Sequence, residues 1–489
     1  MFAAFDNFPA LLIWLPLFGG LMSFFIRNER SVKNWALLSS IVTLVFFLVT
    51  LFFTDKKYYE LNNVSYIWLP DLGSSFTLMI DGMGRLLCLL TAISFPLIFA
   101  STYQSSYKNP GSFYGLMLLT QAGLMGVFLA MDGLAFYFFW ELALIPAYFL
   151  ASQWGGEKRI QASFKFFIYT FIGSLFLLIG LIYVYLKTKD QSFALVSFYT
   201  VNLSPTEQNW LFWLFFIAFA IKMPIFPFHT WQPDAYEQSP TPVTMVLSGI
   251  MVKMGVFALI RWLLPIFPDA SKHYDNIIIG IAVVGMIYAS IMAMVQDDLK
   301  RLVAYSSIAH IGLMAAAIFS FNGVAMQGAM LQMFNHGINI IGLWIVVYFI
   351  ERQTGIRKIS ELGGLANQAP SLAIMLVIIA FANIALPLTN AFIGEFMMFN
   401  GLFTFSPWYT AVAGISIILS AVYTLNMVKN VFYGNVNAVT QNFVDIQLAY
   451  KLVLAIIVVI IFFAGIYPEP LLNVVRESAE MFAKRISGK

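Results

Sequence analysis

Residues 210–230 of the chain have the sequence WLFWLFFIAFAIKMPIFPFHT. The stretch is as long as a helix that crosses the hydrocarbon core of a bilayer, which takes about 20 apolar residues. A lysine, Lys222, lies inside it, and Pro224 and Pro227 follow that lysine closely. The sequence therefore predicts a membrane-spanning helix that carries a charge and is interrupted by proline.

Similar apolar runs recur along the whole chain, and they set the predicted fold. Together with residues 210–230 they number fourteen, so we predict an all-α polytopic membrane protein with about fourteen transmembrane helices. An even number of spans puts both termini on one side of the membrane. The other runs lie near residues 9–26, 33–53, 83–103, 113–130, 133–151, 164–186, 243–264, 275–295, 302–320, 325–350, 371–400, 409–428 and 451–468.

Composition agrees with a chain that is mostly embedded in lipid. The 489 residues are 60% hydrophobic and 10% charged, with a mean hydropathy of +0.81. A soluble domain is roughly 25% charged, so this chain has too few charges to cover a surface that faces water. The net charge of +3 is too small to suggest a nucleic-acid partner. The expected surroundings are therefore the lipid bilayer, with no nucleic acid bound.

The cysteine content argues against a disulfide or a metal site, and the N-terminal sequence argues against a signal peptide. Cys88 lies in the apolar run 86–100, one thiol cannot form an internal disulfide, and no Cys/His cluster offers a metal site. We therefore expect Cys88 to be a packing residue and the chain to hold no metal. No basic segment precedes the first apolar run, so we expect that run to be a mature helix and not a cleaved signal peptide.

The distribution of lysine and arginine predicts the orientation in the membrane. If the termini face outward, the inward loops and helix ends hold fourteen of the 27 Lys and Arg residues and the outward side holds ten. The remaining three, Arg85, Lys222 and Lys253, fall within spans. Because inward loops are enriched in positive charge, we predict that both termini lie outside the cytoplasm.

Two segments differ from the spans. Residues 54–81 contain alternating aromatic and β-branched residues around Gly73, a pattern typical of a short hairpin at the membrane surface. The stretch from Trp231 to Pro242 is polar and contains three prolines, so we predict a loop there.

Six ionisable residues fall in the middle of predicted spans. A charge at the centre of a membrane helix costs roughly 2.5–3.5 kcal/mol on insertion scales, so such residues usually face protein or water and often carry protons or ions. Acids and bases that are buried together can neutralise each other and exchange protons, and histidine titrates near neutral pH. The set predicts a proton relay, although it also fits charges that pair only for structural reasons. The residues are Glu141, Lys222, Lys253, His310, His336 and Glu395.

Proline breaks accompany two of these charges. Lys222 lies at the break made by Pro224 and Pro227, and Glu395 follows Pro387 in a run that is too long for one straight crossing. Paired broken helices are typical of transporters built from inverted repeats, and about five spans separate the two charges. We therefore predict three N-terminal helices with the surface hairpin, a first five-helix repeat, a second five-helix repeat, and a C-terminal helix with a tail. Their bounds are 1–112, 113–264, 265–434 and 435–489.

Several long motifs contain these same residues. They are FWELALIP at 139–146, IKMPIFPFHTWQPDAYEQSPT at 221–241, LSGIMVKMG at 247–255, YSSIAHIG at 305–312 and LPLTNAFIGEF at 386–396. With these motifs the chain resembles the antiporter-like subunits of respiratory complex I, the proton-pumping NADH–quinone oxidoreductase. The resemblance covers essentially the whole chain.

The resemblance implies roles for the buried residues. Glu141 and Lys222 would form the input-side pair, Lys253 and His310 the central link, His336 a further polar step and Glu395 the output group. In the family, one branch has glutamate at the position of Glu395, whereas the sibling subunits and the sodium/proton antiporters typically have lysine. The chain therefore resembles the glutamate branch, and it is expected to lack the long lateral helix of one sibling. One departure is Tyr236, where relatives often have histidine, which puts a proton role for that segment in doubt.

The resemblance also implies the setting of the protein. It would be a multi-pass protein of the inner membrane, with the other membrane-arm subunits of complex I as partners, including two sibling antiporter-like subunits. Electron transfer in those partners would drive the pump, and this chain would carry no cofactor and do no redox chemistry. The alternatives are a subunit of a multisubunit sodium/proton antiporter, a hydrogenase-linked membrane subunit, or a scaffold without transport. Glu395 argues against the sodium/proton antiporter, and the neighbouring genes would decide whether that alternative holds. A Lys222 variant that assembles normally but has lost pumping would exclude the scaffold.

Overall fold

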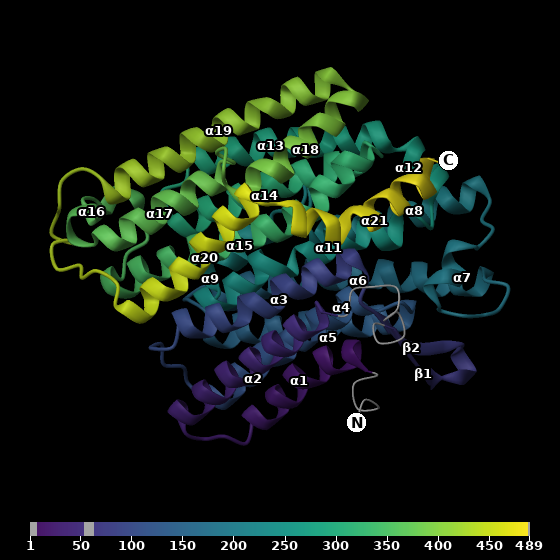
Figure 1. Ribbon diagram of the computed structural model, residues 1–489, viewed down its shortest axis with the longest axis horizontal. Coiled ribbons are helices and arrows are strands. Elements are labelled where there is room, and N and C mark those ends of the chain that lie inside the picture. The colour runs from purple at the N-terminus through teal and green to yellow at the C-terminus, as the bar shows by residue number, and fades with distance from the viewer. Residues whose placement is uncertain (1–6, 53–62, 488–489) are drawn as a thin grey trace. The chain divides into compact units, whose positions relative to one another are not determined.

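The computed structural model describes residues 7–52 and 63–487, and these are almost entirely helical (Figure 1). Within them, eleven helices are long and apolar enough to cross a membrane, and two shorter apolar helices, Phe8–Ser23 and Pro370–Asn383, accompany them. The predicted all-α polytopic membrane fold is confirmed. The number fourteen and the inverted repeats are consistent with the structure and remain predictions.

The chain forms two compact units. The first unit contains the residues up to Met223 together with Ile250–His273, and the second contains Pro224–Gly249 and Tyr274–Ser487. The first unit consists of α1 Phe8–Ser23, α2 Glu29–Thr50, β1 Asn63–Leu69, the 3₁₀ turn Pro70–Leu72, β2 Ser74–Met79, α3 Gly82–Ser101, α4 Pro110–Leu129, α5 Gly133–Trp154, α6 Arg159–Lys187, α7 Leu195–Tyr199, α8 Pro205–Lys222, α11 Lys253–Ala258, the π-helical segment Leu259–Leu263 and α12 Pro268–His273.

The second unit holds the remaining elements, and the π-helical segment Leu247–Met251 joins the two units along the chain. Its elements are α9 Trp231–Gln238, α10 Thr241–Val246, α13 Asp275–Met294, α14 Leu299–Phe319, α15 Gly323–Thr354, the 3₁₀ turn Ile359–Glu361, α16 Leu365–Gln368, α17 Pro370–Asn383, α18 Asn390–Phe405, α19 Pro407–Phe432, α20 Leu448–Ile466 and α21 Glu469–Ser487. α21 occupies the segment that we expected to be a tail.

The predicted hairpin is present, although residues 53–62 lie outside the described residues. β1 and β2 pair in antiparallel register. Gly73 between them has φ +59°, and a Cβ there would collide with the backbone carbonyl of Gln191, so both conformation and space require glycine. Asp132, which caps the start of α5, also accepts hydrogen bonds from the Ser74 hydroxyl and the Ser75 N–H. The hairpin is thereby fixed to the end of a membrane helix.

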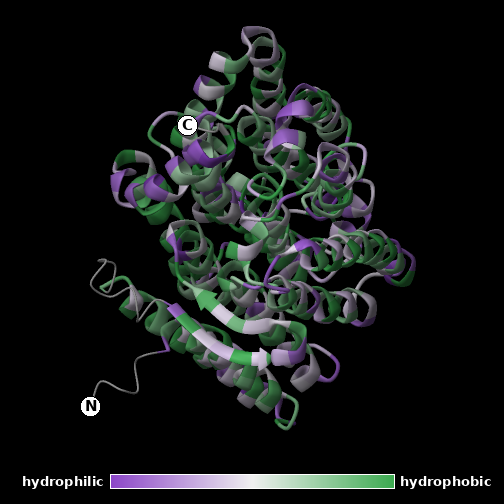
Figure 2. Ribbon diagram, turned by 90° about the vertical axis from the view of Figure 1, so that its right-hand side faces the viewer, coloured by the Kyte–Doolittle hydropathy of each residue, from purple (hydrophilic) through white to green (hydrophobic). Residues whose placement is uncertain are grey.

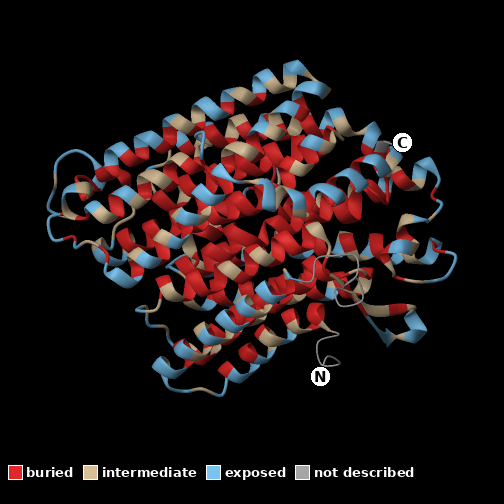
Figure 3. Ribbon diagram, in the orientation of Figure 1, coloured by how far each residue is buried: buried red, intermediate tan, exposed pale blue. Residues whose placement is uncertain are grey.

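The outer faces of the helices are apolar, as lipid contact requires. Ile418 on α19 is 66% exposed and Val459 on α20 is 65% exposed. Figure 2 shows hydrophobic residues along the helices, and Figure 3 shows exposed residues on helices such as α2 and α19. By contrast, the apolar windows of α14 and α15 are buried over their whole length. An apolar face this extensive on a folded chain indicates contact with lipid.

Both predicted helix breaks are observed. α8 ends at Lys222, and helix resumes at Trp231; α17 ends at Asn383, and helix resumes at Asn390. In the second break Ala385 and Leu388 have positive φ, a conformation that costs non-glycine residues energy and that clusters at functional sites.

The prediction of a loop from Trp231 to Pro242 is wrong, because the segment contains α9 and the start of α10. Pro233 lies in the first turn of α9 and Pro242 in the first turn of α10. In a first turn the backbone N–H has no helical partner to lose, so proline is tolerated there. These two prolines mark helix starts, not a loop.

Candidate functional site

The first unit brings Lys222 and Glu141 together. Lys222 is the last residue of α8 and is 2% exposed, and its Nζ lies 5.5 Å from the centroid of the Trp140 ring. Its charge interacts with that of Glu141, one residue after Trp140 on α5, and the Ser174 side chain on α6 also interacts with Glu141. Nζ donates no hydrogen bond to any residue that the structure describes. The buried ammonium group of Lys222 is thus stabilised by the face of the Trp140 ring and by the carboxylate of Glu141.

Lys253 is also buried in the first unit, with 0% exposure. It is the first residue of α11, which lies between π-helical segments at Leu247–Met251 and Leu259–Leu263. Gly255 lets α11 approach α8 closely, since a Cβ there would be 2.7 Å from the carbonyl oxygen of Phe219. π-helical turns are often found at functional sites, and here they flank a buried lysine.

The second unit brings together His310, His336 and Glu395. Nδ1 of His310 on α14 lies 3.0 Å from Oε1 of Glu395 on α18. The ring centroids of His310 and His336, the latter on α15, are 5.5 Å apart. All three residues are at most 8% exposed. The structure thus pairs Glu141 with Lys222 and brings His310, His336 and Glu395 together, whereas for Lys253 it shows burial in the first unit. The link predicted between Lys253 and His310 remains a prediction.

The Glu395 group contains residues that the sequence analysis missed. Gln332 on α15 donates a hydrogen bond of 3.2 Å to Oε1 of Glu395. Tyr423 on α19 interacts electrostatically with Glu395 and donates a hydrogen bond to Ser306. A signal for Gln332 was available, because it precedes His336 by four residues and so lies on the same face of a helix. A small cavity of about 10 Å³, close to the space that one water molecule needs, adjoins the group. It is lined by Met286, Ala309, His310, Leu313, Glu395, Ser416, Ile417 and Ser420.

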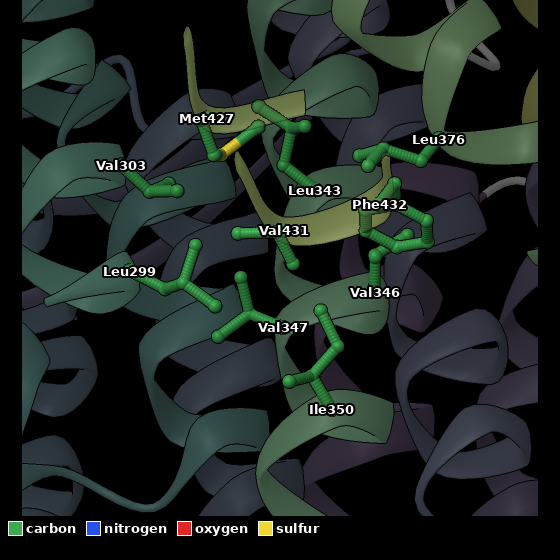
Figure 4. A pocket seen from close by; sticks show the side chains of 10 residues that line it. All are labelled: Leu299, Val303, Leu343, Val346, Val347, Ile350, Leu376, Met427, Val431 and Phe432. Atoms are coloured by element: carbon green, nitrogen blue, oxygen red, sulfur yellow. The ribbon is translucent and has the colours of Figure 1, made fainter. Parts of the chain in front are cut away.

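A second pocket of the same unit, of about 10 Å³, has a wholly apolar lining, as Figure 4 shows. Cavities of this kind stay dry because water finds no polar partner in them. On α15 the apolar lining begins at Leu343, four residues after the buried amide Asn339. The lining residues are Leu299, Val303, Leu343, Val346, Val347, Ile350, Leu376, Met427, Val431 and Phe432.

Two other charged residues were expected at helix ends facing water, and both are buried. Arg261 is 1% exposed and forms an ion pair with Asp81 in the first unit. Lys300 is 3% exposed and lies 2.9 Å from Glu351 in the second unit. Each of these cations has a carboxylate in direct contact, unlike Lys222, so we interpret them as structural pairs.

Comparison with known proteins places the chain in a family. Residues 130–420 match the model of the family described as NADH:quinone oxidoreductase/Mrp antiporter, TM. NADH-quinone oxidoreductase subunit M of Rickettsia prowazekii is 36% identical over 96% of this chain and 97% of the relative. NAD(P)H-quinone oxidoreductase chain 4 of Gloeobacter violaceus is 35% identical over 95% of this chain and 90% of the relative.

A solved structure agrees with these relatives. A chain of respiratory complex I from Thermus thermophilus superposes with a TM-score of 0.91 at 28% identity, over 98% of this chain and 99% of that one. The resemblance predicted from the motifs is confirmed, as is the multi-pass inner-membrane location. The chain belongs to the NADH:quinone oxidoreductase/Mrp antiporter family of membrane proteins, in the antiporter-like branch whose curated members are named subunit M or chain 4.

Proposed function

We propose that the chain moves protons across the membrane through the two buried groups, driven by electron transfer in other subunits. Proton translocation is the general function of its family. The observation that carries the finer proposal is the contact between His310 and Glu395, where a titratable base and an acid lie 3.0 Å apart inside the membrane region. A proton can pass directly between groups at that distance.

In the first group, Lys222 serves as the residue that takes up and releases a proton near the entry side. Its ammonium group donates no hydrogen bond to the described residues and is stabilised by Glu141 and the Trp140 ring. A change in the charge of Glu141 would therefore change the proton affinity of Lys222. Lys253 is the proposed onward group in the same unit.

In the second group, Glu395 is the proposed output residue, with His310 and His336 supplying protons to it. The second helix break precedes α18, the helix that carries Glu395, and Ser416 and Ser420 are among the residues that line the cavity beside Glu395. The dry pocket around Leu343 lies further along α15 and offers no proton carrier. A proton on Glu395 therefore has polar surroundings on the cavity side and none in that pocket.

The partners of the chain are the membrane-arm subunits of the complex, as for its relatives in NADH–quinone oxidoreductase. The chain itself is proposed to bind neither nicotinamide nor flavin nor an iron–sulfur cluster, and to take part in the enzyme as a pump. The family model also covers Mrp antiporters. Glu395, where those antiporters typically have lysine, favours the NADH–quinone oxidoreductase branch.

The test replaces Glu395 in the whole complex, reconstituted into vesicles. Glu395→Gln should abolish the proton pumping of this subunit, because an amide cannot take up and release a proton, while the complex still assembles. Glu395→Lys should retain part of the pumping, since lysine serves at this position in the siblings. Glu480→Gln, on an exposed carboxylate of α21, is the matched control and should pump normally. An unchanged ratio of protons to NADH in Glu395→Gln vesicles would refute the relay.

A further inference from the structure

One face of α15 carries three buried carboxamides. Gln332, Asn335 and Asn339 are spaced by three and four residues, so they share a helix face, and none is more than 1% exposed. Each donates a hydrogen bond to one part of the second broken helix. Buried amides are costly unless paired. Here each NH₂ group is paired, whereas the three side-chain carbonyl oxygens have no hydrogen-bond partner among the described residues.

Two of the three amides fix the ends of the break. Asn339 donates to the carbonyl of Ala382 near the end of α17, at 3.3 Å. Asn335 donates to the carbonyl of Asn390, the first residue of α18, at 2.7 Å, and Asn390 donates back to the carbonyl of Asn335 at 3.4 Å. α15 therefore binds both the end of α17 and the start of α18, and so fixes the two sides of the break relative to each other.

The third amide, Gln332, contacts the carboxylate itself. Its Nε2 lies 3.2 Å from Oε1 of Glu395, the same oxygen that faces His310 Nδ1 at 3.0 Å. The neighbouring Gly394 provides the space, since a Cβ there would be 2.5 Å from Oε1 of Gln332. An amide N–H₂ group only donates, so it stabilises a carboxylate oxygen that carries no proton.

We propose that Gln332 is a positioning residue for proton transfer at Glu395. Its N–H group donates to Oε1 and stabilises the ionised carboxylate that remains once the proton has left, so it favours release of the proton from Glu395. The importance of Gln332 for pumping rests on the proposed function. The effect of Gln332 on the protonation of Glu395 can be measured separately.

The other titratable groups around Glu395 are few. His310 faces it from α14, with His336 on α15 behind that ring, and Tyr423 faces it from α19. α17 has no charged or titratable residue in its sequence, and α20 has only Tyr450 and Lys451, in its first turn. The side chain of Gln332 is neutral at every pH. Its effect on the protonation of Glu395 can therefore be separated from the effects of these titratable groups.

The experiment compares Gln332→Met, which has similar size and no donor, with Gln332→Glu in the purified complex. The protonated carboxyl band of Glu395 in infrared difference spectra is identified by its absence from Glu395→Gln. Loss of a hydrogen bond to an ionised group should move the titration of this band upward by about one pH unit in Gln332→Met. Gln332→Glu should move it further, because a second carboxylate opposes ionisation.

Gln327→Met is the control, because this glutamine lies on the same helix and donates instead to the carbonyl of Leu472. It should leave the band where the native protein has it. An unmoved band in both Gln332 variants would overturn the positioning role. If Glu395→Gln pumps normally while the band still moves in Gln332→Met, the proposed function fails and the positioning role stands. If Gln332→Met does not assemble, Gln332→Glu, which keeps the shape of the side chain, gives the answer.

Discussion

Nδ1 of His310 lies 3.0 Å from Oε1 of Glu395, while Nε2 of the same ring has no hydrogen-bond partner among the described residues. An unsatisfied buried polar atom costs about 1–3 kcal/mol, so structure alone gives no reason to keep the second nitrogen. A histidine that only anchors Glu395 needs one nitrogen, whereas one that relays a proton needs two. The His336 ring, whose centroid is 5.5 Å from that of His310, is the neighbouring titratable group to which we assign the other end of this relay.

The first prediction separates these two roles of His310. In His310→Asn, the amide can place a donor near the position of Nδ1 and so keep a contact with Glu395, but Nε2 is lost. Groups that transfer protons typically contribute about 10²–10⁴-fold to a rate, so pumping by this subunit should fall at least about tenfold. The measurement is NADH-driven acidification of vesicles that contain the assembled complex. Pumping at the native rate would mean that His310 serves only as an anchor.

A second prediction concerns Glu141. Glu141→Gln removes the carboxylate that stabilises the Lys222 ammonium and leaves only the Trp140 ring beside it. Lys222 should then favour its neutral form, and pumping should fall sharply although the complex assembles. Glu157→Gln, in the loop after α5, is the matched control. Full pumping in Glu141→Gln vesicles would contradict the input pairing.

Local patterns predicted much of this structure. Apolar runs of sufficient length predicted the membrane helices, because the bilayer imposes length and composition on each helix separately. Proline beside Lys222 and before Glu395 predicted both breaks, since proline acts on the backbone of its own segment. The prediction of a loop at Trp231–Pro242 was wrong for a related reason: proline does not break a helix in its first turn.

Pairings between helices could not be predicted in the same way. The contact of Gln332 with Glu395 joins residues 63 positions apart, and it depends on the rotation of α15 against α18. The burial of Lys300, near the start of α14, depends on Glu351, near the end of the following helix α15. Sequence shows which side chains are polar inside a span, but tertiary packing decides which of them meet.

The third prediction is the topology. The excess of Lys and Arg on the expected inward loops places both termini outside the cytoplasm. A reporter fused after Lys489 and one inserted in the 153–163 loop should therefore be active on opposite sides of the membrane. Activity of both reporters on the same side would refute this orientation.

The last prediction concerns the ion pair of Lys300 with Glu351. The Lys300 side chain is 4% exposed, and Nζ lies 2.9 Å from Oε2 of Glu351, which also accepts a hydrogen bond from Thr241 at 3.1 Å. Glu351→Gln leaves the ammonium group buried without its carboxylate. We expect a loss of stability of about 1–3 kcal/mol, less than the roughly 3–5 kcal/mol that breaking a fully buried pair costs, because Glu351 is partly exposed.

A double variant tests whether the unpaired charge is the cause. Adding Lys300→Met to Glu351→Gln removes the buried charge and should restore most of the thermal stability of the solubilised complex, because an apolar side chain is tolerated in a buried site. The matched control is Glu361→Gln, whose partner Lys358 is exposed, and it should leave the melting temperature unchanged, since exposed pairs contribute little. A double variant no more stable than Glu351→Gln alone would show that Glu351 acts through Thr241 or Arg357 and not through Lys300.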